Sequence, residues 1–163
     1  MLQITKKGDD NFMVKIYTDG SFKDGYVGYG FLIEGVGIQE QLVTKVSRPG
    51  TTLTNVEAEL RAVLSALKYV RDTKLYEKAR VIVICYDMDG VKKLLTNKSA
   101  HERNGFFRVY AEEFEKVTKA INCKISFEKV RGHEHTIHNK IDRAIRRKLN
   151  MYLSGLREDA VVS

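Results

Sequence analysis

The chain has 163 residues, of which 43% are hydrophobic; this suffices for one packed domain, leaves little room for two, and excludes disorder of the whole chain. Residues 1–12 lack the apolar core of a signal peptide and no apolar run approaches membrane-spanning length, so we expect a cytoplasmic protein without membrane contacts. The formal net charge of +7 favours a polyanionic partner such as nucleic acid.

The first elements along the chain are three strands. Residues 13–18 (MVKIYT) predict a strand that ends at the acidic turn 19–21 (DGS). Residues 26–34 and 37–47 predict two more strands, and the short glycine-containing turn between them indicates a hairpin.

The next element is the clearest helix of the sequence. Thr54 or Asn55 can cap its start, and its apolar residues recur at helical spacing. These apolar residues are Val56, Leu60, Val63, Leu64, Leu67 and Val70. Residues 80–86 (RVIVICY) follow, and their almost continuous apolar character is typical of a strand buried on both faces.

Helices and strands continue to alternate in the rest of the chain. Residues 91–95 predict a short helix, residues 106–121 a longer helix, residues 124–130 a strand and residues 139–153 a final helix. Three strands followed by alternating helices and strands indicate an α/β fold with a mixed sheet and helices packed on it. We expect one domain over residues 13–155, with tails at 1–12 and 156–163.

Two groups of residues are predicted to be core rather than functional. Cys85 and Cys123 lie in apolar, strand-like segments, and we expect them to be reduced rather than joined in a disulfide. Four aromatic residues near the start of helix 106–121 could form a base-stacking platform, but their helical spacing favours core packing. They are Phe106, Phe107, Tyr110 and Phe114.

Two aspartates follow directly after predicted strands. Asp19 closes the first strand, and Asp87 closes the buried fourth strand. Such strand ends are where α/β sheets usually place ligands, although a single aspartate there can also be an ordinary turn residue or helix cap.

Helical geometry distinguishes the two glutamates of helix 54–70. At about 100° per residue, Glu57 shares its side with Arg61, with which it can pair, and is expected on a solvated charged face. Glu59 instead shares its side with Ala62 and Ala66, where small residues allow a neighbouring element to approach closely. Because a partly enclosed carboxylate is the better metal ligand, we predict Glu59 as the functional acid. By the same reasoning, Asp142 borders the apolar stripe of the last helix.

Four segments that contain these acids resemble the motif regions of the type 1 ribonuclease H family. They are IYTDGS at 16–21, TNVEAELRAVLSAL at 54–67, VICYDMDGV at 83–91 and VRGHEHTIHNKIDRAI at 130–145. They occur in the family's order, and together they span nearly the whole chain. The YDMDG run is closer to a bacterial subgroup with a YDY-type third motif than to the more familiar TDS version.

The resemblance implies a fold, a set of site residues and a substrate. The family fold is a five-stranded mixed sheet, three antiparallel strands followed by two parallel ones, flanked by helices. His133 matches the family's loop histidine, which assists proton transfer or product release. The residues that match the metal-binding acids are Asp19, Glu59, Asp87 and Asp142. The expected substrate is an RNA/DNA hybrid, and the expected state is a monomer without an obligate protein partner.

Two-metal catalysis explains why four acids are needed. Two divalent cations about 3.5–4 Å apart activate water, neutralise the phosphate and stabilise the leaving oxygen. Mg²⁺ prefers such oxygen ligands, so we expect two Mg²⁺ per site, with Mn²⁺ as a substitute. In this hypothesis Asp19 bridges both ions and Asp142 helps to hold the ion that activates water. Glu59 and Asp87 would hold the ion near the leaving group.

Substrate contacts are expected on both sides of the acids. Discrimination against double-stranded DNA would come from contacts to the 2′-hydroxyls of the RNA strand. The residues proposed for hybrid binding are Gly20, Ser21, Asn55, Lys92, Lys93 and Arg103, with Lys98 as a further candidate. The chain departs from the family at Val56, where a second asparagine is common, and at residues 22–25, which replace a glycine- and proline-rich loop.

Three alternatives remain open at this stage. One is a DNA-directed nuclease of the same superfamily, and another is a non-catalytic nucleic-acid-binding module on the same fold. The third is a zinc site at His133, His135 and His138, whose spacing matches no strong zinc signature. Arg143, Arg146 and Arg147 form a basic helix face that could contact nucleic acid or could be solvated surface.

Overall fold

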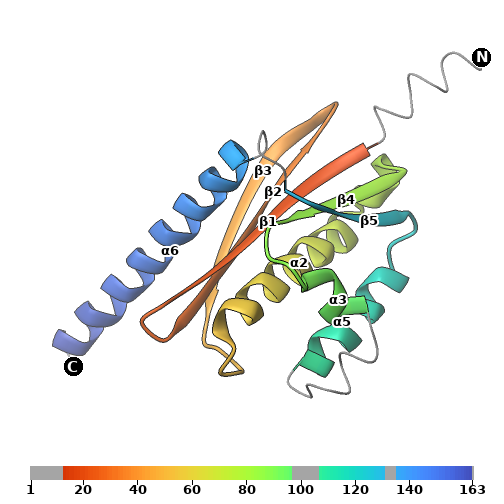
Figure 1. The fold of residues 1–163 in the computed structure, drawn as a ribbon. Helices are drawn as coiled ribbons and strands as arrows, with labels where there is room; N and C mark the ends of the chain where they lie inside the picture. Colours follow the sequence, from red (N-terminus) through yellow and green to blue (C-terminus); the bar gives the residue numbers. More distant parts are fainter. Residues whose placement is uncertain (1–12, 97–106, 131–134, 163) are drawn as a thin grey trace, which may run out of the picture.

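The computed structural model describes residues 13–96, 107–130 and 135–162, which form one five-stranded sheet between two layers of helices (Figure 1). The strand order is β3-β2-β1-β4-β5. The first three strands are antiparallel: β1 (Met13–Lys23), β2 (Tyr26–Gly35) and β3 (Ile38–Ser47). β4 (Val81–Tyr86) runs parallel to β1, and β5 (Lys124–Lys129) runs parallel to β4. The expected mixed sheet of three antiparallel and two parallel strands is thus confirmed.

Helices cover both faces of the sheet. α2 (Thr54–Thr73) packs on one face, together with α3 (Val91–Thr96) and α5 (Arg108–Lys119), and α6 (His135–Val162) covers the other face (Figure 1). A short 3₁₀ turn, η1 (Leu75–Lys78), leads from α2 into β4. None of the helices within the described residues is long and apolar enough to cross a membrane.

Each face of the sheet has its own apolar core. Along β1, Val14 and Ile16 are buried beneath α2, and Tyr17 faces α6. Ile141, Ile145 and Leu149 form an apolar stripe along α6 and are fully buried against the sheet. Two cores on one sheet explain why β4 is apolar on both of its faces.

The core predictions for cysteines and aromatic residues are confirmed where the structure describes them. Cys85 is buried and Cys123 is half-buried, and neither forms a disulfide. Phe107 is buried, and Tyr110 and Phe114 pack against the same core. Phe106 lies outside the described residues.

β1 does not end at the acidic turn that the sequence predicted. The strand continues to Lys23, and Asp19 pairs with Gly30 of β2 within it. The turn lies at Asp24 and Gly25, where both residues have positive φ (49° and 86°). An Asp-Gly-Ser run has the composition of a turn, but pairing with β2 overrides this local preference.

Two further helix predictions were wrong at the ends. The N-cap of α2 is Leu53 rather than Thr54 or Asn55, and no side-chain hydrogen bond from a described residue caps the helix. α6 begins at His135, four residues before the predicted start, and continues to Val162 rather than ending at residue 153. Its longer course places His138 inside the helix, which matters for the site.

Candidate active site

The predicted acids come from four separate elements and meet at one edge of the sheet. Pairing between β1 and β4 stops at Tyr17 and Cys85, so Asp19 lies just beyond the end of the paired region of β1. Asp87 follows directly after β4, and the carboxyl ends of adjacent parallel strands are the usual place for a ligand site. α2 contributes Glu59, and α6 contributes Asp142.

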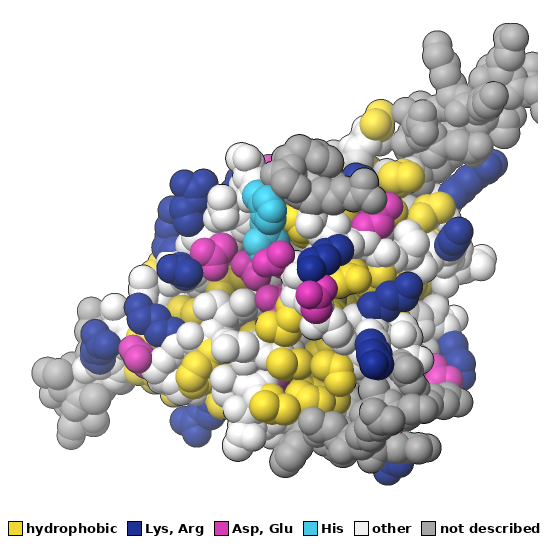
Figure 2. Space-filling model, in the orientation of Figure 1, with side chains coloured by type: hydrophobic (Ala, Val, Ile, Leu, Met, Phe, Trp, Pro, Cys, Tyr) yellow, Lys and Arg dark blue, Asp and Glu magenta, His cyan; other side chains and the backbone are white. Residues whose placement is uncertain are grey.

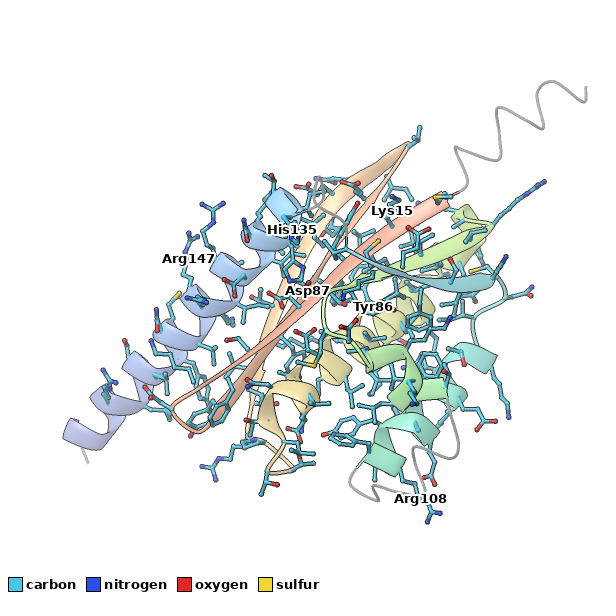
Figure 3. The ribbon with its side chains drawn as sticks, in the orientation of Figure 1. Lys15, Tyr86, Asp87, Arg108, His135 and Arg147 are labelled. Carbon is cyan, nitrogen blue, oxygen red and sulfur yellow. The ribbon has the colours of Figure 1, made fainter. Side chains whose placement is uncertain are left out.

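Acidic side chains gather in the middle of this face of the molecule, directly beside histidine side chains, with Lys and Arg side chains around them (Figure 2). Figure 3 places Asp87 at the end of β4, beside the first turns of α6.

Asp19 and Glu59 form the buried part of the site. Their residues are 6% and 5% exposed, and the Gly20 amide donates a hydrogen bond to Asp19 Oδ1 (2.9 Å). Burial, followed by the charge of Asp19 and a hydrogen bond with it, raises the pKa of Glu59 to about 9. Glu59 is therefore protonated at neutral pH in the metal-free protein and can donate a hydrogen bond to the Asp19 carboxylate. Its second oxygen, Oε2, is buried and has no hydrogen-bond partner among the described residues.

The close approach of β1 and α2 depends on Gly20. A Cβ atom at this position would lie 2.4 Å from the backbone carbon of Ala58 and 2.6 Å from the amide nitrogen of Glu59. Only a residue without a side chain lets the strand approach α2 so closely. Gly20 is thus packed against α2, and its predicted contact with the hybrid stays a prediction.

Asp87 and Asp142 form the open side of the site. The side chain of Asp87 is 51% exposed and that of Asp142 is 31% exposed. Arg146, one turn further along α6, pairs with Asp142 at 3.1 Å. The site is therefore closed at Asp19 and Glu59 and accessible to solvent and substrate at Asp87 and Asp142.

His138, which the sequence indicated only as part of an alternative zinc site, also lies among the acids. Its Nε2 lies 3.2 Å from Asp19 Oδ1 and 3.7 Å from Asp87 Oδ2, and the residue is 7% exposed. Burial lowers its pKa, but the hydrogen bond and charge of Asp19 and the charges of Asp87 and Asp142 outweigh it, so the net pKa is raised. The available signal was the i, i+4 spacing with Asp142, which places both side chains on one helix face.

Glu57 is not on a solvated face. The residue is fully buried, and both carboxylate oxygens accept the Gly50 amide (2.8 and 2.9 Å). The expected pair with Arg61 is present, with Nε 3.3 Å from Oε2, and the Arg61 guanidinium lies 5.9 Å from the ring centre of Tyr110. The prediction failed because the segment before α2 folds back over this face of the helix, which helical spacing does not reveal.

The other predicted substrate residues are dispersed around the acids. Ser21 is half-buried in β1, and Asn55 is exposed in the first turn of α2. Lys92 and Lys93 are exposed on α3. His133, Lys98 and Arg103 lie outside the described residues, so their predicted roles remain predictions.

Hard divalent cations fit the donors of this site. The donors are carboxylate oxygens, and the orphaned Oε2 of Glu59 is a buried acceptor that a cation would satisfy. In the part of the chain that the structure describes, no group of three or more His, Cys, Asp or Glu side chains is arranged so that it could hold a metal ion. The Nε2 atom of His138 lies 3.2 Å from Asp19 Oδ1 and 3.7 Å from Asp87 Oδ2.

Comparisons with known proteins agree with this architecture. A family model described as RNase H matches residues 11–149. No curated protein is similar enough to be counted as a relative.

Solved structures share the fold at low sequence identity. RNase H1 from the archaeon Halobacterium salinarum is 21% identical, with a TM-score of 0.56 over 72% of this chain and 85% of the other. An N-terminal RNase H domain from Mycobacterium tuberculosis is 18% identical, with a TM-score of 0.57 over 84% and 99%. LC11-RNase H1, isolated from compost and solved with an RNA/DNA hybrid, is 16% identical, with a TM-score of 0.61 over 83% and 99%.

Proposed function

Because the chain belongs to the RNase H family, we propose that it cuts the RNA strand of RNA/DNA hybrids with the help of two divalent cations. The proposed metal ligands are Asp19, Glu59, Asp87 and Asp142. The third motif, with Tyr86 before Asp87, supports the bacterial YDY-type subgroup of the family.

The buried pair of Asp19 and Glu59 carries this proposal. Asp19 and Glu59 are a pair of carboxylates that are about 95% buried, and the His138 imidazole lies beside Asp19, with Nε2 3.2 Å from Oδ1. Such a pair costs folding free energy, because buried charges are stable only when paired or coordinated. A bound cation removes that cost, since it favours the ionised form of both acids. The arrangement is therefore better explained by metal binding than by stability.

The two halves of the site have different parts in the reaction. When bound, the cations activate water and stabilise the negative charge that develops on the phosphate and on the leaving oxygen. Asp19 lies between Glu59 and His138 and would serve as a ligand to the cations. Glu59 closes the site from the side of α2 and excludes water there. Asp87 and Asp142 face solvent and leave the site open to a phosphate.

The substrate assignment draws on the surroundings of the acids. One neighbour by fold, LC11-RNase H1, was solved with an RNA/DNA hybrid, and the same substrate class fits the basic surface here. Asn55 and Ser21 flank the acids and are the proposed contacts to the 2′-hydroxyls of the RNA strand. Lys92 and Lys93 are exposed on α3 and are the proposed phosphate contacts. The protein is proposed to act as a monomer.

A single-stranded and duplex substrate panel tests this function. The panel contains a labelled RNA/DNA hybrid, the matching RNA and DNA duplexes and each single strand, with Mg²⁺, Mn²⁺ or EDTA. We expect metal-dependent internal cuts only in the RNA of the hybrid. Binding without cutting under every metal would instead indicate a non-catalytic module, and cutting of DNA would indicate a DNA-directed nuclease.

His133 is proposed to assist proton transfer or product release near the scissile bond. A histidine side chain suits that task, because the ordinary pKa of an imidazole lies close to neutral pH. The variant His133→Ala should lower the turnover rate and leave metal binding, measured by calorimetry, unchanged. An unchanged turnover rate would remove His133 from the mechanism.

A further inference from the structure

The family resemblance assigned no role to His138, yet this side chain lies among three of the four acids. Its Nε2 is 3.2 Å from Asp19 Oδ1 and 3.7 Å from Asp87 Oδ2, and the charge of Asp142 also acts on it. His138 and Asp142 are one helical turn apart, so α6 holds both side chains toward the same space. An ion bound between Asp19 and Asp87 would therefore be within reach of Nε2.

The second ring nitrogen shows how Nε2 could become a ligand. Nδ1 is buried and has no hydrogen-bond partner among the described residues. Its surroundings therefore do not fix which nitrogen carries the proton of the neutral ring. A neutral imidazole with its hydrogen on Nδ1 presents the Nε2 lone pair toward Asp19 and Asp87, where an ion held by these two carboxylates would lie.

From these contacts we propose that His138 Nε2 directly binds the divalent ion held by Asp19 and Asp87, an inference that rests on the proposed metal-dependent function. The site then has one nitrogen donor among its carboxylate oxygens. Mg²⁺ gains little from such a donor, because it prefers oxygen ligands and keeps several waters. First-row transition metals gain more, and Co²⁺ gains more than Mn²⁺. The site therefore favours Co²⁺ and Mn²⁺ over Mg²⁺ more strongly than an all-carboxylate site does.

Mn²⁺ is the probe for a direct test without any nucleic acid. Mn²⁺ bound to the full chain is studied by electron spin-echo envelope modulation, which detects a directly coordinated ¹⁴N nucleus. The compared proteins are the wild type, His138→Ala, His138→Asn and the matched control His135→Ala. His135 starts the same helix and is exposed, so its removal leaves the space between the acids unchanged.

The nitrogen coupling is expected in the wild type and in His135→Ala and absent from both His138 variants. Two results overturn the proposal: no coupling in the wild type, or coupling that persists when His138 is replaced. The wild-type measurement is independent of whether a variant folds, and circular dichroism checks the folding of each variant. If Mn²⁺ does not bind at all, both this inference and the proposed metal dependence fail. If it binds without a nitrogen signal, only this inference fails.

Affinities give a second, graded readout. Kd for Mn²⁺ is measured from the free-ion signal, and Kd for Co²⁺ and Mg²⁺ from competition with Mn²⁺. In His138→Ala we expect Co²⁺ to bind about 10- to 100-fold more weakly, Mn²⁺ to lose less, and Mg²⁺ to change by less than about 3-fold. An equal loss for all three metals would mean that His138 only positions Asp19. Tighter binding of all three would mean that the imidazole competes with the ion, and either result overturns the proposal.

Discussion

Glu57 and Glu59 are two residues apart in α2 and both are buried, but their surroundings differ in kind. The Glu57 carboxylate accepts the Gly50 amide with both oxygens and pairs with Arg61, so the chain itself offsets its charge. Glu59 faces Asp19 instead of a cation, has a pKa raised to about 9 and has no hydrogen-bond partner for Oε2 among the described residues. Burial of an acid therefore does not mark a functional site, whereas burial without a compensating cation does.

The two glutamates also differ in where their partners come from. Gly50 and Arg61 are both within seven residues of Glu57, so the structural site is local in sequence. Glu59 contacts Asp19 of β1, and the charge of Asp87, which follows β4, also raises the pKa of Glu59. The functional site therefore exists only once the sheet and α2 have come together.

The largest effect is expected at Asp19, which faces both Glu59 and His138. The variant Asp19→Asn should lower the single-turnover cleavage rate of a labelled hybrid by roughly a thousand-fold, because it removes the charge proposed to touch both ions. Asp24→Asn is the matched control, since Asp24 is exposed in the turn after the same strand. Near-normal cleavage by Asp19→Asn would refute the assignment of this acid.

The next effect is a pH dependence of stability in the absence of metal. The pKa of Glu59 is raised in the folded protein, so the folded state keeps a proton that the unfolded chain releases. Stability in EDTA should therefore fall as pH rises from about 4.5 towards 9, by at most about 1.4 kcal/mol per pH unit. Urea unfolding at several pH values measures this slope. Glu59→Gln or saturating Mg²⁺ should flatten it, and an equally steep slope in Glu59→Gln would assign the effect to other groups.

Substitution of Gly20 should have a smaller effect, which is confined to the contact between β1 and α2. Gly20→Ala should destabilise the protein by about 3 kcal/mol, because the added methyl group meets the backbone of Ala58 and Glu59. Gly155→Ala is the opposite case: its added Cβ would meet no described atom within 4 Å, and it lies in α6. That variant should stabilise by about 0.5–1 kcal/mol. Equal effects of the two substitutions on the urea midpoint would contradict the close packing.

The smallest effect is expected at the structural acid. Glu57→Gln should destabilise the protein by about 1–3 kcal/mol, since it leaves the half-buried Arg61 without its charged partner. Chemical unfolding at neutral pH in EDTA should show the opposite sign for Glu59→Gln, which removes the free-energy cost of keeping Glu59 protonated in the folded protein. A destabilised Glu59→Gln variant in EDTA would mean that Glu59 is also compensated in the folded chain.

Local patterns predicted the order of helices and strands and the four acids, because hydrophobic periodicity and strand ends are properties of short segments. The sequence could not show that β1 passes through Asp19, since pairing with Gly30 comes from the next strand. Helical spacing predicted a solvent-exposed Glu57, but the backbone at Gly50, which lies outside the helix, covers this side chain. His138 was missed because the helix was predicted to start one residue after it. Each error concerns a contact that forms between elements.

Cleavage by Glu57→Gln and Glu59→Gln tests the central claim most directly. Both variants exchange one buried carboxylate of α2 for an amide of the same shape, and both are assayed on the same RNA/DNA hybrid in Mg²⁺ under single-turnover conditions. We predict that Glu59→Gln loses at least about 100-fold in rate, while folded Glu57→Gln stays within about 3-fold of the wild type. Full activity of Glu59→Gln, or an equal loss in both variants, would contradict the assignment of Glu59 to the metal site.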